Sequence, residues 1–553
     1  MKRLFTSLMV VALAVVMVGC NNDGAAAGGS NYTMAVSDNA VGVVRFDVNQ
    51  VLEKSGMKAE LTQKAEQAMA QQGMPKMLRD LVVDFRNTGI DMNVPAYAWA
   101  NFIDSNTVFV GVVAKVASKS KFENLLNYLN KESGGELPIK SNNDYTIIYD
   151  AYDPEVVLAF NNEAVVIGTT QSLENDYYSN SKKDAKPYVV EAIQNVISGV
   201  AGGSVLPTYE GSDAALCINM NPFMDAMQLA LRGNYDADLA MALAQMEPVR
   251  NAKFNFAFNF AQGSIDFNMM VQNIPNNMGY AAPHCSNANL QYVSADALAV
   301  ANLPIDGAAM LTALNTVLDN NPEIKQQLND VLKSELSLTW NAILPMATPL
   351  VNSLKGDITV ACNDIKLSTY YDPYYGYYGD YRTQAELDGC ALVGVSNNTI
   401  MNTVSGLMIA VPEVSKVGAD TYTTNFEGNK VYFGQKGNAL FLSSPYVLES
   451  ASRPATSAEW YPAVQNSYGY VVVNIASMLK NPTFYKALND EVKREFDSSA
   501  YTVMQLADAL NYFVISVPSQ ESVSMRLVLK NANTNALAQL ANIVRPEVER
   551  LLK

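Results

Sequence analysis

Apolar and polar positions follow two periods along this chain. The stretch Phe254 to Ala261, FNFAFNFA, has an aromatic residue at every second position, which predicts a strand. The stretch Lys119 to Asn130, KSKFENLLNYLN, repeats apolar residues at intervals of three and four, which predicts an amphipathic helix. Strand patterns dominate and few helical patterns separate them. The chain is therefore expected to be α+β, each part a mostly antiparallel sheet with helices packed on one face.

The first half contains a defined order of expected elements. A strand, a pair of helices and a hairpin come first, followed by a helix, three short strands and a second helix, and then by a strand, a helix and a closing hairpin. Their expected bounds are Val41–Val48, Gln50–Ala70, Lys76–Arg86, Ala96–Ile103 with Thr107–Val116, 119–130, three strands within 145–168, Tyr188–Ile197, Ala214–Met220, a helix from Pro222, and 254–273.

The second half repeats segments of the first. Three pairs match in the same order and at nearly the same separation: Val36–Val43 with Val293–Val300, Ala215–Met220 with Tyr470–Ile475, and Ser264–Asn273 with Ser522–Asn531. Concordant order predicts an internal duplication. The expected organisation is a signal peptide at 1–19, a tether at 20–33, a first repeat at 34–275, a junction at 276–290 and a second repeat at 291–553.

The N-terminus has the pattern of a secretion signal. Lys2 and Arg3 precede an apolar run, and Gly19 stands directly before Cys20. The sequence MVGCNN resembles a bacterial lipobox, at which signal peptidase cuts before a cysteine that then carries a diacylglycerol. Cys20 is therefore the expected lipid attachment, with a plain secreted protein as the alternative. Asn21 resembles the sorting residue of outer-membrane lipoproteins, and periplasmic or surface orientation stays open.

Charge and composition narrow the class of partner. The chain has 38 Lys and Arg against 54 Asp and Glu, a formal net charge of -16. Such a charge repels phosphate backbones, so no nucleic-acid partner is expected. With 49% hydrophobic and 17% charged residues, the chain has the composition of a globular protein.

Motifs for catalysis are absent from the sequence. His284 is the single histidine, which excludes HExxH zinc sites and leaves one residue for any triad. Its neighbour Cys285 is one of four cysteines beyond Cys20, too few for a disulfide scaffold. No catalytic residue, metal site or cofactor is predicted. A pair of carboxylates could still serve a hydrolase, because the sequence spacing of such a pair is unconstrained.

Three asparagines, Asn219, Asn302 and Asn474, stand near the ends of apolar strands that precede helices. An asparagine in such a place can cap a helix or stabilise a turn, which is the favoured interpretation. A role in ligand binding is the alternative.

The stretch 368–383, STYYDPYYGYYGDYRT, is expected to be a long hairpin loop inserted into the second repeat. Pro373, Gly376 and Gly379 rule out a regular helix there. Tyrosine offers flat apolar area with a hydroxyl, as recognition surfaces require, and its ring can stack on sugars. The candidate binding residues are Tyr370, Tyr371, Tyr374, Tyr375, Tyr377, Tyr378 and Tyr381. The alternative is a loop that packs on its own domain.

The lipobox, the two strand-rich halves and the stretch Gly89 to Leu126, which begins GIDMNVPAYAW and ends KSKFENLL, resemble a family of uncharacterised Bacteroidetes-type lipoproteins classed as a domain of unknown function. The resemblance implies the anchor and the architecture and carries no known active site. The expected function is a membrane-anchored envelope lipoprotein of the outer membrane that binds a glycan, a peptide or an envelope protein without catalysis. The alternative is a carboxylate-dependent hydrolase of envelope or dietary polysaccharide.

Overall fold

The computed structural model separates the chain into two compact units. Unit 1 comprises Met1–Pro275 and Asn533–Lys553, and unit 2 comprises Asn276–Ala532. The described residues are 31–56, 63, 88–103, 107–132, 138–150, 154, 156–172, 186–199, 206–207, 211–233, 237–274, 283–372, 380–408, 411–426, 429–444, 451–487, 493–494 and 500–551. The expected helix at 76–86 and most of the one at 50–70 lie outside them.

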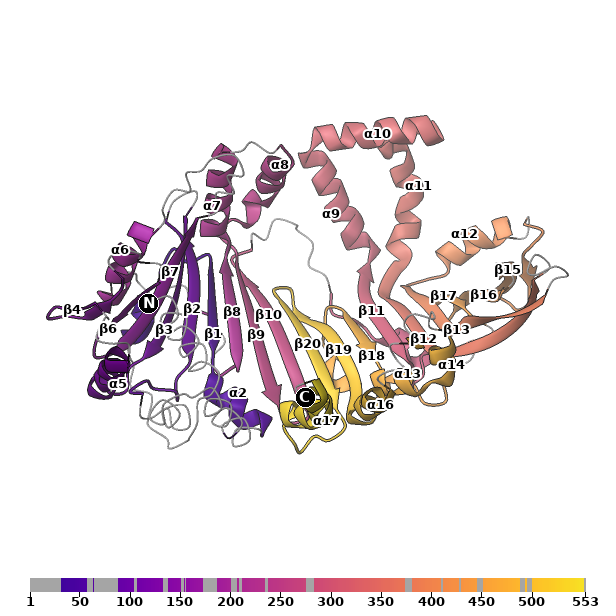
Figure 1. Ribbon diagram of the computed structural model, residues 1–553. Helices are drawn as coiled ribbons and strands as arrows, with labels where there is room; N and C mark the ends of the chain where they lie inside the picture. Colours follow the sequence, from indigo (N-terminus) through magenta and orange to yellow (C-terminus); the bar gives the residue numbers. More distant parts are fainter. Residues whose placement is uncertain are drawn as a thin grey trace. The chain divides into compact units, whose positions relative to one another are not determined.

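Unit 1 contains an antiparallel sheet whose described strands follow the order β4-β5-β6-β7-β3-β2-β1-β8-β9-β10 (Figure 1). The strands are β1 (Gly42–Phe46), β2 (Ala96–Phe102), β3 (Thr107–Lys115), β4 (Ile139–Ser141), β5 (Thr146–Ile148), β6 (Val156–Phe160), β7 (Ala164–Ser172), β8 (Ala214–Asn219), β9 (Lys253–Ala261) and β10 (Ser264–Gln272). These bounds confirm the strands expected from the sequence.

Unit 2 contains an antiparallel sheet in the order β14-β15-β16-β17-β13-β12-β11-β18-β19-β20. The strands are β11 (Ala299–Asp306), β12 (Leu354–Asp372), β13 (Asp380–Val395), β14 (Ser415–Lys416), β15 (Thr421–Phe426), β16 (Asn429–Lys436), β17 (Ala439–Ser443), β18 (Tyr470–Val473), β19 (Leu510–Ser519) and β20 (Ser522–Leu529). The order of these strands is that of unit 1, strand for strand, with every label advanced by ten.

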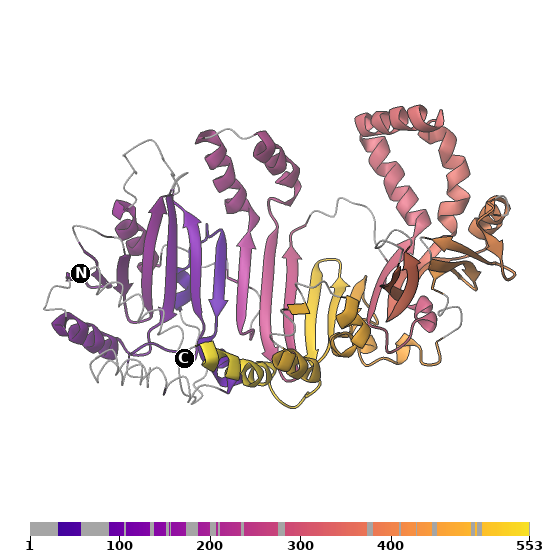
Figure 2. The same ribbon diagram turned by 45° about the vertical axis from the view of Figure 1, so that its right-hand side comes forward.

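The helices of unit 1 connect and cover its strands. They are α2 (Val48–Ser55), α5 (Lys119–Glu132), α6 (Lys186–Ile197), α7 (Met220–Gly233), α8 (Ala237–Met246) and α17 (Ala536–Leu551), with 3-10 turns η1 (Asn31–Ala35) and η3 (Glu247–Val249). Helix α17 packs against α2, β9 and β10 (Figure 2). Asn535, just before it, donates from Nδ2 to the Phe260 carbonyl at 2.8 Å. The sequence pattern placed this C-terminal segment in the second repeat, whereas it packs in unit 1.

The expectation that helices cover one sheet face is wrong for unit 1. Residues Val157 to Phe160 of β6 are all buried, so this strand needs a cover on both faces. Helix α6 packs with Val157 and Ala159, whereas α5 packs with Leu158 and Phe160. Since successive residues of a strand point to opposite faces, α5 and α6 lie on opposite sides of the sheet.

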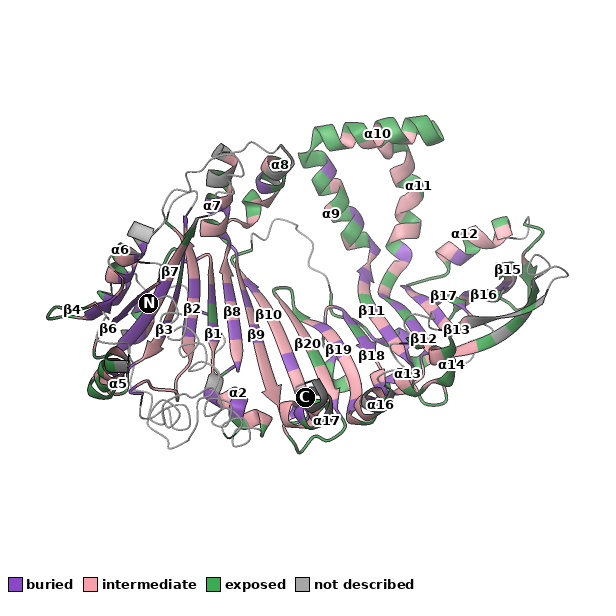
Figure 3. Cartoon of the chain, in the orientation of Figure 1, coloured by how far each residue is buried: buried purple, intermediate pink, exposed green. Residues whose placement is uncertain are grey.

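The helices of unit 2 are α9 (Gly307–Asn320), α10 (Pro322–Leu336), α11 (Trp340–Ser353), α12 (Thr399–Met408), α13 (Ile475–Lys480), α14 (Pro482–Ala487) and α16 (Ala500–Ala509), with 3-10 turns η4 (Ala288–Tyr292), η5 (Ala455–Ser457) and η6 (Tyr461–Ala463). Helices α9 to α11 project from the ends of β11 and β12, and α10 has no buried residue (Figure 3). No helix among the described residues is long and apolar enough to span a bilayer.

Asn255 of β9 is fully buried, and neither its amide oxygen nor its amide nitrogen has a hydrogen-bond partner in the described structure. Asn255→Leu is therefore expected to raise the free energy of unfolding by about 1–2 kcal/mol, because a buried unpaired polar group costs about that much. Chemical denaturation of Asn255→Leu and of the unchanged protein measures the difference in the free energy of unfolding. Asn259→Leu is the control on the same strand, since Asn259 accepts from Lys54 Nζ at 2.7 Å and should lose stability instead. Equal losses in both variants would show that Asn255 has polar partners.

Candidate functional site

The described residues of the tyrosine-rich stretch, 368–372 and 380–383, are strand, so the prediction of a loop is wrong for them. Strand β12 continues to Asp372 and β13 begins at Asp380, and Tyr371 pairs directly with Tyr381. Tyr374, Tyr375, Tyr377, Tyr378 and Cys20 lie outside the described residues, and Tyr370 lies on β12 with no described side chain. The reason for the strand is the alternation of the flanking residues, which gives both strands one apolar face.

Beyond the sheet, β12 and β13 form a two-stranded ribbon with one apolar face. On that face Ile365 pairs with Leu387 and Tyr371 with Tyr381, and Leu367 and Thr369 lie between them on β12. The side chains of Leu387 and Tyr381 are 68% and 71% exposed. The two tyrosine rings stand edge to face with centroids 5.4 Å apart. The apolar face of this ribbon is therefore the one that meets solvent.

The opposite face of the ribbon is polar and is fastened to unit 2. Asp388 accepts from Ser444 Oγ and lies beside Lys366 Nζ, both at 2.8 Å. Asp364 accepts from Nδ2 of Asn481, directly before α14, at 2.9 Å. These contacts hold the base of the ribbon and fix which face points outward.

The exposed face of the ribbon continues onto the sheet of unit 2. A β-bulge between Cys362 and Asp364 inserts one extra residue in β12, which keeps its apolar residues on one face on both sides of the bulge. One cross-strand row on this face is entirely apolar and consists of Leu442, Ala391, Val360, Ala301, Val471, Ile515 and Met525. Leu303 and Ile358 form a neighbouring pair on the same face. We define the apolar strip as the exposed apolar residues of this face, on the sheet and on the ribbon: Leu303, Ile358, Val360, Leu367, Tyr371, Tyr381, Leu387, Leu442 and Val471.

The reverse face of the same sheet carries the core of unit 2. Ala361, Cys390 and Leu392 are buried there, together with Trp460 and Val464 from the segment before β18. Unit 2 is therefore covered on one face, whereas the strip on the other face remains uncovered by any described element. Contiguous exposed apolar area of this kind marks binding surfaces in soluble proteins. Apart from the tyrosines, sequence reasoning missed these residues, although the alternation of DIKLSTYY at 364–371 signals a ribbon.

His284 and Cys285 do not form a catalytic pair. The His284 ring lies on Tyr468, with 4.1 Å between centroids, and its Nδ1 contacts the Asn466 carbonyl at 2.6 Å. The Cys285 thiol is buried and faces the Asn302 carbonyl at 3.8 Å. Burial, with a smaller contribution from Asp357, raises the pKa of this thiol to about 12, so it is not a nucleophile at neutral pH. The four cysteines in the described structure are free.

A buried polar network lies behind the sheet of unit 2. Asp357 accepts from the Ser286 backbone and hydroxyl at 2.8 Å each and from the Asn287 backbone at 2.5 Å. Asn302 donates to Asn287 Oδ1 at 3.1 Å and accepts from Thr359 Oγ1 at 2.5 Å. Asn302 is thus a core residue of β11, and its prediction as a helix cap is wrong. Asn474 does cap α13, accepting from the Ser477 backbone at 3.1 Å.

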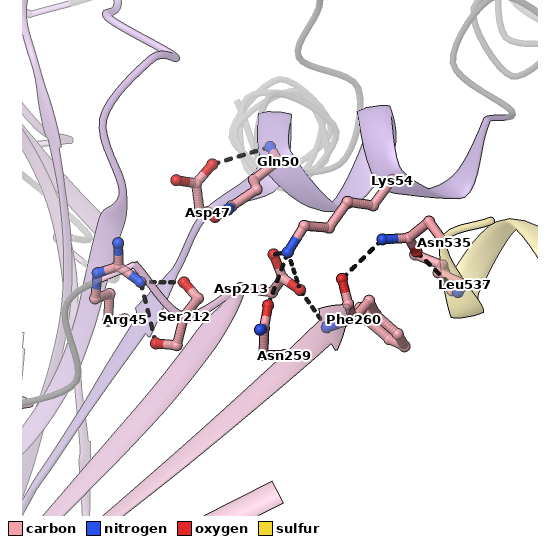
Figure 4. Close-up of polar contacts among 10 residues, drawn as sticks. All are labelled: Arg45, Asp47, Gln50, Lys54, Ser212, Asp213, Asn259, Phe260, Asn535 and Leu537. Carbon is pink, nitrogen blue, oxygen red and sulfur yellow. Dashed lines mark hydrogen bonds and ion pairs between the residues drawn. The ribbon is translucent and has the colours of Figure 1, made fainter. Parts of the chain in front are cut away.

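Unit 1 has a buried ion pair at the end of its sheet (Figure 4). Asp213 is fully buried and lies 2.8 Å from Lys54 Nζ, and it accepts from the Phe260 backbone at 2.6 Å. Like the carboxylate of Asp357, this carboxylate has its polar contacts with other residues of its own unit. Across the described residues, no group of three His, Cys, Asp or Glu is placed to hold a metal ion.

Comparisons with solved structures find two crystal forms, III and IV, of TP0453. Each shares 10% sequence identity with this chain. The matches cover 46% and 44% of this chain and 82% and 81% of the TP0453 chains, with TM-scores of 0.22 and 0.23. So weak a likeness carries no argument about fold or activity. No curated protein matches the chain. The model of the family described as a domain of unknown function, DUF4836, matches residues 32–537, and the protein therefore belongs to that family.

Proposed function

We propose that this protein is a lipid-anchored envelope protein that binds another protein through the apolar strip of unit 2. The observation that carries the proposal is the exposed, continuous apolar face of the ribbon and sheet, held in place from its polar side. The lipobox at Cys20 supplies the anchor, and Asn21 favours the outer membrane. In this proposal the protein is a binding component without catalytic chemistry of its own.

The composition of the strip favours a protein partner over a glycan. Sugar sites combine an aromatic face with hydrogen-bonding side chains, whereas seven of the nine strip residues are aliphatic and the other two are tyrosines. Aliphatic area gains free energy only when it is covered by other apolar groups, as in the core of a protein interface. The tyrosine pair supplies the large, rigid side chains that dominate binding energy in such interfaces.

We also propose that the two units descend from one duplicated unit. The common strand order supports this, and so does the register. Unit 1 has an apolar row at the corresponding strands, formed by Ile167, Val112, Ala98, Val44, Leu216, Phe256 and Met269. Its β2-β3 hairpin lacks the ribbon extension. Recognition would therefore be a property gained by unit 2.

Site-specific photocrosslinking in living cells tests the proposed binding. With benzoylphenylalanine in place of Tyr381, we expect one discrete adduct of this protein with a second polypeptide. Adding Leu387→Asp should reduce the adduct about ten-fold or more, because a charge buried in the centre of an interface costs more than about 1.4 kcal/mol. Leu387→Met, which keeps the apolar area, should leave the adduct unchanged.

The controls separate the strip from other exposed apolar surface. Val331 of α10 is 58% exposed, and a crosslinker placed there should not give the same adduct. An adduct that is insensitive to Leu387→Asp, or no adduct at Tyr381, would contradict the proposal. An adduct that glycosidase removes but protease does not would show that the strip binds a glycan. An adduct whose added mass is that of a lipid would show that the strip contacts a membrane.

A further inference from the structure

A cavity of about 450 Å³ opens in unit 1, away from the apolar strip. Its walls come from η1, from the turn that joins β6 to β7, and from the last turn of α6 with the residues that follow it. The volume lies in the range of sites for small organic ligands, about 300–1,000 Å³.

The turn that forms one wall is rigid. Asn161 Oδ1 accepts from the backbone amides of Glu163 and Ala164, both at 2.8 Å. Asn161 Nδ2 points to the Ile197 carbonyl at 3.4 Å, which connects the turn to the end of α6. The cavity is therefore a feature of ordered backbone, and Glu163 is held at its rim.

The electrostatics of the lining favour a positive ligand. Glu163 supplies a carboxylate, and no Lys or Arg is found among the described lining residues. The C-terminal end of α6, which carries the negative end of the helix dipole, forms another wall. Tyr32 donates its hydroxyl to the Pro95 carbonyl at 2.8 Å, and burial raises the pKa of its phenol, so this wall adds no negative charge.

Apolar side chains form a further part of the lining, beside the polar Asn161 and Ser198. Met34 contributes an exposed side chain, and the largely buried Val196 and Ile197 form the aliphatic wall behind it. A ligand that matches both parts has a charged amine and a compact apolar body. We propose that the cavity binds a small organic cation, with its primary ammonium beside the Glu163 carboxylate and its apolar part against Met34, Val196 and Ile197.

Calorimetric titration of the purified full chain tests this site, with phenethylamine as the probe. We expect saturable binding of phenethylamine and none of 2-phenylethanol or 3-phenylpropanoate at equal concentration, because these have the same apolar body without the positive charge. Glu163→Gln should weaken phenethylamine binding about three- to five-fold, the effect of removing a partly exposed ion pair. Ser198→Trp, at an exposed lining position, should abolish binding by filling the cavity.

Glu191→Gln is the matched control, because Glu191 is an exposed glutamate of α6 outside the lining. It should bind phenethylamine as the unchanged protein does. Thermal unfolding of each variant checks that the fold is intact. The proposal would be overturned by absence of saturable binding, by equal affinity for the alcohol, or by equal effects of Glu163→Gln and Glu191→Gln. None of these outcomes bears on the strip, which belongs to unit 2.

Discussion

Asp213→Ala is expected to lower the free energy of unfolding of unit 1 by about 3–5 kcal/mol. The carboxylate is fully buried beside Lys54, at 2.8 Å, and accepts from the Phe260 amide at 2.6 Å (Figure 4). Its removal leaves the Lys54 ammonium, whose side chain is 21% exposed, without its counter-charge. The Phe260 amide loses its acceptor as well. Both groups lie in a region with little access to water, so water does not replace the lost partner.

Hydrogen exchange of peptides from β1, β8 and β9 measures this change, because it reports on unit 1 separately. Asp213→Asn should cost less than Asp213→Ala, since the amide oxygen can still accept from Phe260. Asp225→Ala is the control, because Asp225 forms an exposed ion pair with Arg250 and should show no measurable change. A stability equal to that of the control would mean that the buried pair contributes nothing to the fold.

Asp357→Ala is expected to lower the free energy of unfolding of unit 2 by at least about 3 kcal/mol. Three donors from the exposed Ser286 and the buried Asn287 converge on this buried carboxylate and have no other described acceptor. Two of them are backbone amides, and no side-chain rearrangement can remove the amide of the buried Asn287 from the interior. Their loss should loosen the segment before η4 from the sheet.

Exchange of peptides covering 283–292 and β12 tests this prediction, with the peptides of unit 1 as an internal control. Ser286→Ala removes one donor together with its need for an acceptor, and it should cost about 1 kcal/mol. If Asp357→Ala and Ser286→Ala were equally stable, the two backbone amides would have found solvent, and the network would be peripheral to the stability of unit 2.

Local patterns predicted most elements of the first half correctly. The strands of the β2-β3 hairpin, helices α5 and α6 and the closing β9-β10 hairpin begin and end within a few residues of the expected positions. The reason is that period and turn residues act over short distances along the chain. The same reasoning placed 368–383 between two strands of a hairpin but expected a loop there, whereas 368–372 and 380–383 continue the strands.

Residues whose environment depends on distant partners were predicted less well. Asn302 has the sequence context of a cap, but the strands on either side and the segment at 285–289 bury it in a polar network. No sequence motif marked Ser286 and Asn287 as members of this network, because their partner Asp357 lies on β12, far along the chain. No spacing rule connects residues that meet only through sheet register.

The sequence by itself determined the class of elements, the acidic charge, the lack of catalytic motifs and the lipobox expectation, because each rests on local composition or on neighbouring residues. Only the tertiary structure decided which sheet faces are covered. In unit 1, α5 and α6 cover opposite faces, whereas in unit 2 the apolar strip has no described cover. An apolar residue has the same hydrophobicity whether covered or exposed, and packing between distant segments decides which of the two it becomes.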